Sequence, residues 1–202
     1  MAKNMVAGVR SVRLVSALAG MVGVAGSAAL VWHASYSAFS ASTANPTNTW
    51  SAGSVTLSDD DAGVAMFAAS ALTPGAGGTK CIAVTSTGTL PAAVKLYGTG
   101  YATTNALAAN IDLAITQGTG GGSGSCIGFT PLASGASVYT GTLAGFATSA
   151  TNYATGQGSW TPTGTGADTR VYQIHYTLNT NTPNTAENGT ATLGFTWEAQ
   201  NS

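Results

Sequence analysis

The chain has 202 residues, of which 6% are charged, and Ala, Thr, Gly and Ser make up more than half of it. Ordinary globular proteins carry roughly 25% charged residues. Six scattered cations cannot form the basic stripe of a nucleic-acid-binding protein. The composition also excludes a coiled coil, which would be rich in Glu, Lys and Leu. The length suits one domain and a targeting segment.

The first 37 residues are typical of a secretory signal peptide with a helical apolar core. An apolar stretch runs from Leu14 to Trp32, and the next charge after it is Asp59. Three cations precede this stretch, at Lys3, Arg10 and Arg13. An uncleaved membrane anchor is the alternative, because the stretch is long enough to span a bilayer. Both interpretations predict a domain that works outside the cytoplasm, secreted or at the cell surface, and touches a membrane only through this leader.

Small residues mark a cleavage site at the end of the leader. Ser35 and Ser37 occupy the two positions that must be small, so cleavage is expected between Ser37 and Ala38. Residues 38–50 would then form an extended N-terminal segment, and 51–202 the folded domain. The cleaved chain keeps three of the six cations and all seven acids, a net charge of 3 − 7 = −4.

Period-two alternation predicts strands throughout the domain. The clearest case is the last segment, where Leu193, Phe195 and Trp197 alternate with polar or small residues. The predicted strands are Ser54–Leu57, Val64–Ala68, Cys81–Ser86, Ala92–Tyr97, Ile111–Thr116, Ser137–Leu143, Arg170–Asn179 and Thr190–Gln200. Turn signals separate them, among them Gly98–Gly100 and a glycine-rich loop at Gly118–Ser125, and Ala106–Ala109 could form one helical turn. Short strands with short connections predict an all-β fold, a single jelly-roll-like antiparallel β-sandwich.

The run Asp59-Asp60-Asp61 is the one dense group of charges. It predicts a solvated hairpin turn between Val55–Leu57 and Val64–Ala68, with Gly63 easing the backbone. Weak calcium binding is the compatible alternative, since carboxylates are hard oxygen ligands. The spacing does not match an EF-hand, whose bidentate Glu would fall at Ser70. No other cofactor or metal is expected.

Two cysteines, Cys81 and Cys126, are predicted to form a disulfide, because exported cysteines usually pair. A loop of this length gives roughly 4 kcal/mol in the chain-entropy estimate. A reactive or metal-binding thiol pair would need a nearby histidine or acid cluster, and the sequence shows none.

Catalytic constellations are scarce. His33 lies in the leader, and His175 is predicted on the wet face of a strand. The sequence contains no helical zinc-protease motif, no nucleophile elbow and no phosphate-binding loop. An exported hydrolase is nevertheless one hypothesis for the function. One cleft would then have to bring together several acids and a histidine, namely Asp112, Asp168, Glu187, Glu198 and His175.

Four short pieces follow the leader in order: Ala38-Phe39-Ser40, Trp50, Ala52-Gly53 and Val55-Thr56-Leu57. Together they resemble the leader junction of the TasA/camelysin family of exported bacterial proteins, which have a SipW-type signal peptide. The segments Ser58–Phe67 and Leu72–Gly75, and the closing Thr196–Gln200, are similar to members from high-GC Gram-positive bacteria. The resemblance implies a jelly-roll domain, export, and assembly into extracellular or biofilm-matrix fibres. The metalloprotease activity described for camelysin is not carried over, because the histidines are too few.

In fibre-forming relatives the segment after the cleavage site can become a donor strand for the next subunit. The matching segment is Ala38–Trp50, in which Phe39 is the only large apolar residue before Trp50 and Pro46 interrupts strand pairing. The leading hypothesis is therefore a secreted, non-catalytic structural protein of the cell surface or matrix, which associates with itself through sheet edges. Its nearly uncharged sheets fit this, because charge normally prevents edge pairing.

The alternative is a secreted binding module for cell-envelope glycans or surface proteins. Exposed aromatic side chains could stack on sugars. The candidates are Tyr97, Tyr101, Tyr153 and Trp160, which in a sandwich are more often core or loop anchors. No nucleic-acid partner is expected.

Overall fold

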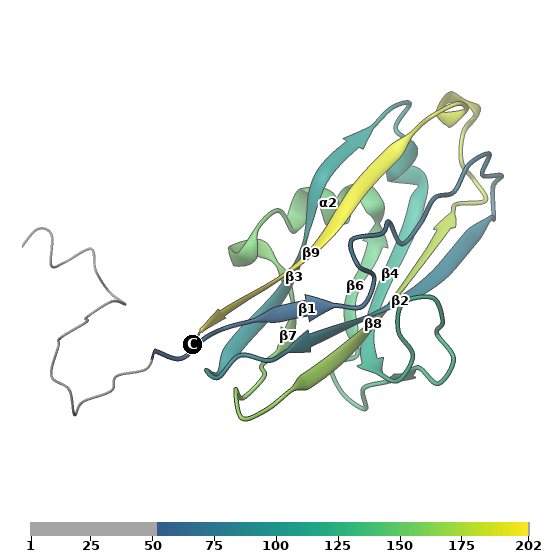
Figure 1. Cartoon of the computed structure of the whole chain (residues 1–202). Helices are drawn as coiled ribbons and strands as arrows, with labels where there is room; N and C mark the ends of the chain where they lie inside the picture. Colours follow the sequence, from purple (N-terminus) through teal and green to yellow (C-terminus); the bar gives the residue numbers. More distant parts are fainter. Residues whose placement is uncertain (1–51, 202) are drawn as a thin grey trace, which may run out of the picture. The chain divides into compact units, whose positions relative to one another are not determined.

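The computed structural model describes residues 52–201, and they fold into two antiparallel sheets (Figure 1). The larger sheet has the strand order β1-β2-β8-β4-β5, with β6 also paired to β4, and the smaller sheet has the order β7-β3-β9. The bounds in the larger sheet are β1 Leu57–Asp59, β2 Gly77–Ser86, β4 Ile111–Thr119, β5 Thr130–Pro131, β6 Ser137–Thr142 and β8 Asp168–Leu178. Those in the smaller sheet are β3 Ala92–Thr103, β7 Gln157–Trp160 and β9 Ala191–Asn201.

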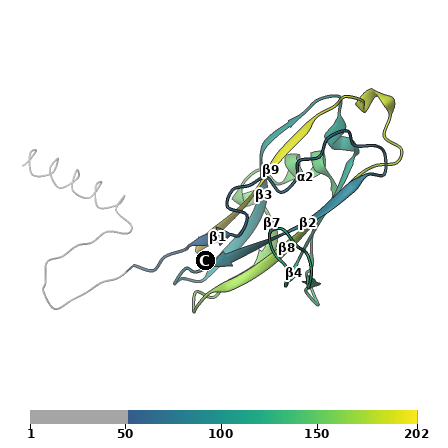
Figure 2. The ribbon, with the colours of Figure 1, turned by 45° about the vertical axis from the view of Figure 1, so that its right-hand side comes forward.

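Consecutive strands mostly change sheet. The chain passes from β2 to β3, back to β4, and later from β7 through β8 to β9, crossing between the sheets at each of these connections. This is the connectivity of a jelly-roll-like sandwich, so the predicted all-β fold is confirmed. The longest pairings are β2 with β8 and β3 with β9, and Figure 2 shows these long strands side by side.

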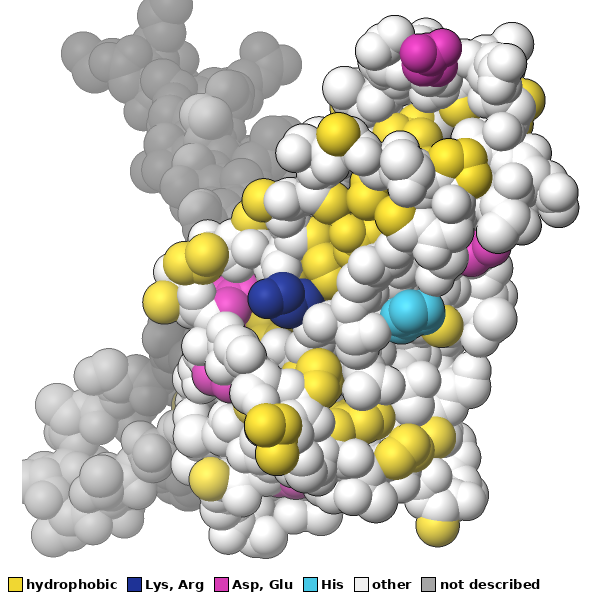
Figure 3. All heavy atoms as spheres, turned by 90° about the vertical axis from the view of Figure 1, so that its right-hand side faces the viewer, with side chains coloured by type: hydrophobic (Ala, Val, Ile, Leu, Met, Phe, Trp, Pro, Cys, Tyr) yellow, Lys and Arg dark blue, Asp and Glu magenta, His cyan; other side chains and the backbone are white. Residues whose placement is uncertain are grey.

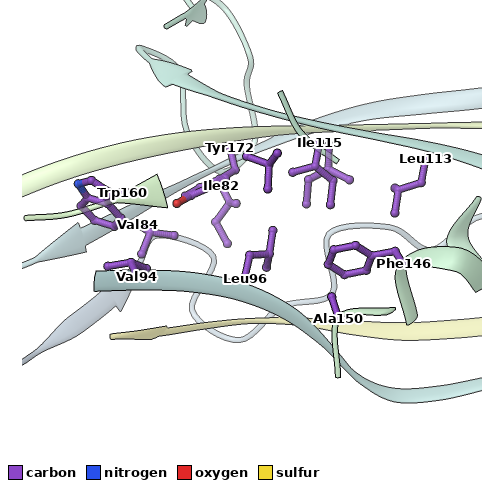
Figure 4. Close-up of a cluster of buried hydrophobic side chains, with 12 residues drawn as sticks. Ile82, Val84, Val94, Leu96, Leu113, Ile115, Phe146, Ala150, Trp160 and Tyr172 are labelled. Carbon is purple, nitrogen blue, oxygen red and sulfur yellow. The ribbon is translucent and has the colours of Figure 1, made fainter. Parts of the chain in front are cut away.

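The core lies between the sheets because alternate residues of each strand point inward. On β2 and β8 the inward rows include Ile82, Val84, Tyr172 and Ile174, which are at most 2% exposed. Figure 4 shows side chains of the two layers pointing toward one another, with Leu96 opposite this group. The outward row of β8 contains His175, which is exposed as predicted. Val171 shares the outward row with His175 by alternation, but it is buried.

A short helix closes one side of the sandwich. α2 (Leu143–Ser149) follows β6 directly, and the Thr142 hydroxyl accepts a hydrogen bond from the Gly145 backbone N–H at 3.0 Å. This is an N-cap, which supplies an acceptor to one of the free N–H groups of the first turn. Phe146 of α2 is fully buried and packs edge-on against Tyr139. The sequence pattern did not predict α2, nor the strands β5 and β7.

Three 3-10 turns lie in the connections. They are η1 (Leu107–Asn110), η2 (Tyr153–Thr155) and η3 (Asn184–Ala186). The first coincides with the helical turn expected at Ala106–Ala109.

Two predictions of local structure are wrong. Gly98–Gly100 is not a turn but part of β3, which continues to Thr103 with an irregularity between Thr99 and Ala102.

The second wrong prediction is the strand Val64–Ala68 and its hairpin. This segment is irregular, and β1 pairs with β2 instead, with Leu57 opposite Ser86. The physical reason is tertiary: Val64 and Phe67 suit a strand locally, but Phe67 packs on Tyr176 of β8, and such contacts override local β-propensity. A turn does follow the aspartates: Ala62 and Gly63 both have positive φ, and the Val64 N–H donates to the Asp61 carbonyl at 3.1 Å.

Several predicted features of the N-terminal part lie outside the described residues. They are the signal helix in 1–37, the cleavage positions Ser35, Ser37 and Ala38, and the segment 38–50 with Phe39 and Trp50. The strand expected at Ser54–Leu57 is shifted, since β1 begins at Leu57. The residues before it still bond to the β2–β3 connection, where the Thr89 N–H donates to the Ser54 carbonyl at 2.7 Å.

Candidate functional site

The side of the sandwich opposite α2 is open. There β1 ends the larger sheet and β9 ends the smaller one, and the two edge strands approach each other. A crevice of about 200 Å³ lies between them. Its lining comes from β1, β2 and β9 and comprises Leu57, Ser58, Asp59, Val84, Phe195, Thr196 and Trp197. The crevice therefore joins two sheet edges, which is a place where an added strand could bind.

Within residues 52–201, the outer edge of β9 is unpaired. β9 pairs with β3 on one side, and on the other side it forms no backbone hydrogen bond with the described part of the chain. Alternate N–H and C=O groups of a strand point to each side, so about half of those of β9 face outward without a backbone partner. The only charged residue among its 11 is Glu198. A long, nearly uncharged edge of this kind is a template for strand addition.

Aromatic side chains form the floor behind this edge. Phe195 and Trp197 are partly buried and pack on Phe146 and Tyr172, with ring centroids 5.8 and 5.2 Å apart respectively. Burial raises the pKa of the Tyr172 phenol, which therefore stays neutral. The buried Trp197 Nε1 lies close to the Tyr172 hydroxyl, and their interaction partly offsets this rise in the pKa of Tyr172.

The outer face of the smaller sheet carries a polar cluster. The Tyr97 hydroxyl donates to Glu198 Oε2 at 2.8 Å, and Gln200 Nε2 donates to Glu198 Oε1 at 2.8 Å. These hydrogen bonds, first from Gln200 and then from Tyr97, hold the pKa of Glu198 below its ordinary value. The same bond to Glu198 is the main cause that raises the pKa of Tyr97. Glu198 is thus an ionised hydrogen-bond acceptor with both oxygens engaged.

The three aspartates do not converge on one point. Asp60 Oδ1 accepts from the Ala83 N–H at 2.8 Å, and its Oδ2 accepts from the Ser123 N–H at 2.7 Å. Asp61 Oδ1 accepts from the Gly63 N–H at 2.8 Å. Partial burial, and then the neighbouring Asp61 carboxyl, raises the pKa of Asp59. No group of three or more possible metal ligands occurs among the described residues, and Asp60 instead joins β2 to the glycine-rich loop.

The predicted disulfide is present. Cys81 on β2 and Cys126 in the loop between β4 and β5 are bonded, with their Cα atoms 5.3 Å apart. Together with Asp60 it holds the glycine-rich loop on the outer face of the larger sheet. Ile127, directly after Cys126, is 88% exposed. The disulfide indicates that the protein folds in an oxidising compartment.

The acids and the histidine of the hydrolase hypothesis are dispersed. Asp112 lies opposite Thr177 near the end of β8, whereas Asp168 begins that strand, about 30 Å away at the usual rise per residue. Glu198 belongs to the other sheet. His175 lies on the outer face of the larger sheet, where its ring nitrogens contact the hydroxyls of Thr79 and Thr177 at 2.8 and 3.0 Å. Glu187 is an exposed residue next to η3.

The four aromatic candidates also differ in exposure. Trp160 is 2% exposed, and its Nε1 donates to Asp168 at 3.1 Å, so it cannot stack on a sugar. The Tyr153 hydroxyl donates to the Ala93 carbonyl at 3.0 Å, which makes it a loop anchor. Tyr97 and Tyr101 remain partly exposed.

Comparison of the chain with known proteins does not assign a function to this site. No protein-family model matches the chain, and no curated protein matches it. Among the residues that the structure describes, no helix is long and apolar enough to cross a membrane. The family resemblance therefore still depends on the residues at the leader junction.

Sequence reasoning identified the strand β9 but not its place at an open edge. The alternation of Leu193, Phe195 and Trp197 shows which face is buried. The alternation contains no signal for the order of the strands in the sheet, and this order decides whether the outer edge of β9 is paired. The roles of Asp60 and of Phe67 were missed for the same reason, because each contacts residues far away in the sequence.

Proposed function

We propose that this chain is a secreted, non-catalytic structural protein of the cell surface or extracellular matrix. In this proposal it assembles into fibres or oligomers by β-strand addition at the outer edge of β9. The observation that carries the proposal is that edge: 11 residues long, with one charge, and without a backbone partner in residues 52–201. Low charge and length are the properties that native proteins normally avoid at sheet edges.

Secretion is supported by two independent features. The N-terminal sequence has the basic, apolar and small-residue regions of a signal peptide. The Cys81–Cys126 disulfide fits the oxidising conditions that an exported protein meets.

The donor in this proposal is the segment 38–50 of a second copy. It contains no charged residue and exceeds β9 in length, so it could pair along the whole edge. Main-chain hydrogen bonds would supply the affinity, and Phe39 would supply an apolar anchor. Pro46 lacks an N–H, which an added edge strand tolerates where that position faces solvent.

Donor and acceptor are different surfaces of the same chain, and this determines the kind of assembly. A contact between two unlike surfaces is heterologous and repeats from one copy to the next. It gives an open filament unless the rotation between copies closes a ring. Fibres or closed rings, rather than two-fold dimers, are therefore expected.

Electron microscopy and light scattering of the protein recovered after export test the proposal, with N-terminal sequencing to establish the cleavage site. The expected result is fibres or oligomers, and their loss in Phe39→Ala but not in the matched control Thr43→Ala. A wild-type protein that stays monomeric at high concentration after authentic cleavage would show that the proposal is wrong.

A second candidate function is binding of cell-envelope glycans at the outer face of the smaller sheet. The specific observation in its favour is that the partly exposed Tyr97 lies beside the ionised Glu198 and the Gln200 amide. An aromatic ring next to hydrogen-bonding groups suits a sugar. Retention of the wild type on purified envelope glycan, and loss of retention in Tyr97→Ala, would support it; no retention of the wild type removes it.

A further inference from the structure

The segment between β1 and β2 crosses the open side of the sandwich. Figures 1 and 2 both show its dark-blue trace between the edge strand β9 and the strand β2. We call its middle part, residues 65–72, the strap. The strap therefore lies beside the edge where the proposed function requires an incoming strand to bind.

Among the described residues, the strap is held by side-chain contacts alone. Met66 and Phe67 are partly buried against the core, and the ring of Phe67 meets that of Tyr176 edge-on, with centroids 5.0 Å apart. Leu72 is partly buried, and the other five residues are exposed. None of the eight forms a hydrogen bond, from backbone or side chain, with any residue of the described domain. Neither sheet edge is thus paired by the strap.

Both ends of the strap are fixed. Before it, the turn at Asp61–Val64 is closed by a backbone bond, and Asp60 is bound to β2 and to the glycine-rich loop. After it, the Gly75 N–H donates to the Leu178 carbonyl at 2.7 Å, and the Leu178 N–H donates to the Ala76 carbonyl at 2.8 Å. A loosely held segment between two fixed points can swing away without unfolding the sheets.

The β2 edge beside the strap also has no strand partner within the described residues. β1 covers only Val84–Ser86 of β2, and Asp60 caps the Ala83 N–H. The N–H groups of Thr79 and Cys81 alternate with those paired to β8, so they point to the same side as that of Ala83. Figure 3 shows this side of the domain, where charged side chains are sparse and apolar atoms are visible between uncharged ones.

We propose that the strap is a displaceable cover of the β9 acceptor edge, and that the segment 38–50 of a second copy replaces it during assembly. The proposal rests on the proposed function and adds the step that controls it. An incoming strand can form the backbone hydrogen bonds that the strap does not form. Opening of the strap breaks the contacts of Met66, Phe67 and Leu72 with the sandwich. Because this costs free energy before the new strand is bound, the strap sets the rate of assembly.

The first test loosens the strap. Phe67→Ala removes the ring that contacts Tyr176, and we expect about tenfold faster association with a synthetic peptide of residues 38–50. Val138→Ala is the matched control, because it weakens the core at β6, away from the strap. Faster association in Phe67→Ala alone supports the cover; an equal acceleration in both variants, or in neither, overturns it.

The second test locks the strap. In the double variant Phe67→Cys/Tyr176→Cys a short bifunctional thiol reagent joins the two positions, and in the control both thiols are capped by a monofunctional reagent. We expect the capped protein to bind the peptide and to assemble, and the locked protein to lose both properties. When the peptide binds to the wild type, hydrogen exchange at the β9 amides should become slower, because the strap has left and the peptide pairs with this edge.

The outcomes separate the two proposals. If wild-type protein neither assembles nor binds the peptide, the proposed function fails and the cover fails with it. If wild-type, capped and locked proteins all assemble equally, strand addition stands and only the cover is overturned. Assembly of the wild-type and capped forms without assembly of the locked form supports both.

Discussion

Two irregular segments lie against the sandwich, and they are held in opposite ways. The connection between β4 and β5, residues 120–129, contains most of the glycine-rich loop. It is attached by the Cys81–Cys126 disulfide, by the bond from the Ser123 N–H to Asp60, and by backbone bonds within the connection. The strap has none of these and depends on apolar contacts. Covalent and hydrogen-bonded attachment is therefore concentrated in one segment, while the other covers the free sheet edges.

This difference follows from chain entropy. A glycine-rich segment loses more conformational freedom on ordering than any other, so its placement needs strong attachments. The strap is rich in alanine and therefore needs fewer attachments to be ordered. Its few contacts also make it the easier segment to open. Asp60 links the two regions, since it begins the connection that contains the strap and holds the glycine-rich loop.

Removal of the disulfide should have the largest effect. In Cys81→Ser/Cys126→Ser the loop is free in the unfolded chain, and the free energy of unfolding should fall by about 4 kcal/mol. Urea unfolding without reductant measures this. Limited proteolysis should then cut within Gly120–Phe129 before it cuts the strap. A stability equal to that of the wild type would show that the loop is held by other contacts.

Phe67→Ala should have the next largest effect. A fully buried Phe costs about 3–5 kcal/mol when truncated, so a partly buried one should cost about 2 kcal/mol. Urea unfolding of this variant beside Ile127→Ala makes the comparison, because Ile127 is 88% exposed and its truncation should cost less than about 0.5 kcal/mol. Equal losses in the two variants would mean that the strap is not packed on Tyr176.

Asp60→Asn should destabilise by about 1 kcal/mol. The amide keeps one acceptor, so it can bind either the Ala83 or the Ser123 N–H but not both. Hydrogen exchange at Ser123 and Ala83 should become faster. Glu187→Gln is the matched control, since it is an exposed acid whose side chain forms no hydrogen bond within 52–201. Unchanged exchange at both amides would contradict the role assigned to Asp60.

The contrast between the loop and the strap also explains what the sequence could predict. The alternation in β8 and β9 and the pairing of the two cysteines are local or pairwise signals, and both predictions are confirmed. The strap is different. Phe67 is placed by Tyr176, which is more than a hundred positions away, and nothing in its own neighbourhood indicates that contact.

The missed elements have similar causes. The helix α2 begins at Leu143 because Thr142 caps it and Phe146 fills the core. In the sequence, Leu143 still fits the alternating pattern of the preceding strand, so the helix start was not recognised. β7 has only four residues, too few for an alternating pattern to stand out, and it forms because Trp160 lies opposite Val94. The openness of the β9 edge depends on the order of all strands, which no single segment encodes.

The smallest expected effect concerns Asp59, at the base of the same open side. Its folded-state pKa is raised, so the ionised carboxylate is less stable in the folded chain than in the unfolded one. This penalty is small below the ordinary pKa and grows as the pH rises through the raised value. Asp59→Asn should therefore be more stable than the wild type at neutral pH, by less than about 0.5 kcal/mol for so exposed a group, with no difference at low pH. Thermal unfolding across this pH range measures the gain, which should also shrink in high salt if charge repulsion from Asp61 contributes to it. A gain independent of pH would mean that Asp59 acts through its shape rather than its charge. The single acid of β1 would then have no electrostatic effect on a strand that binds in the crevice.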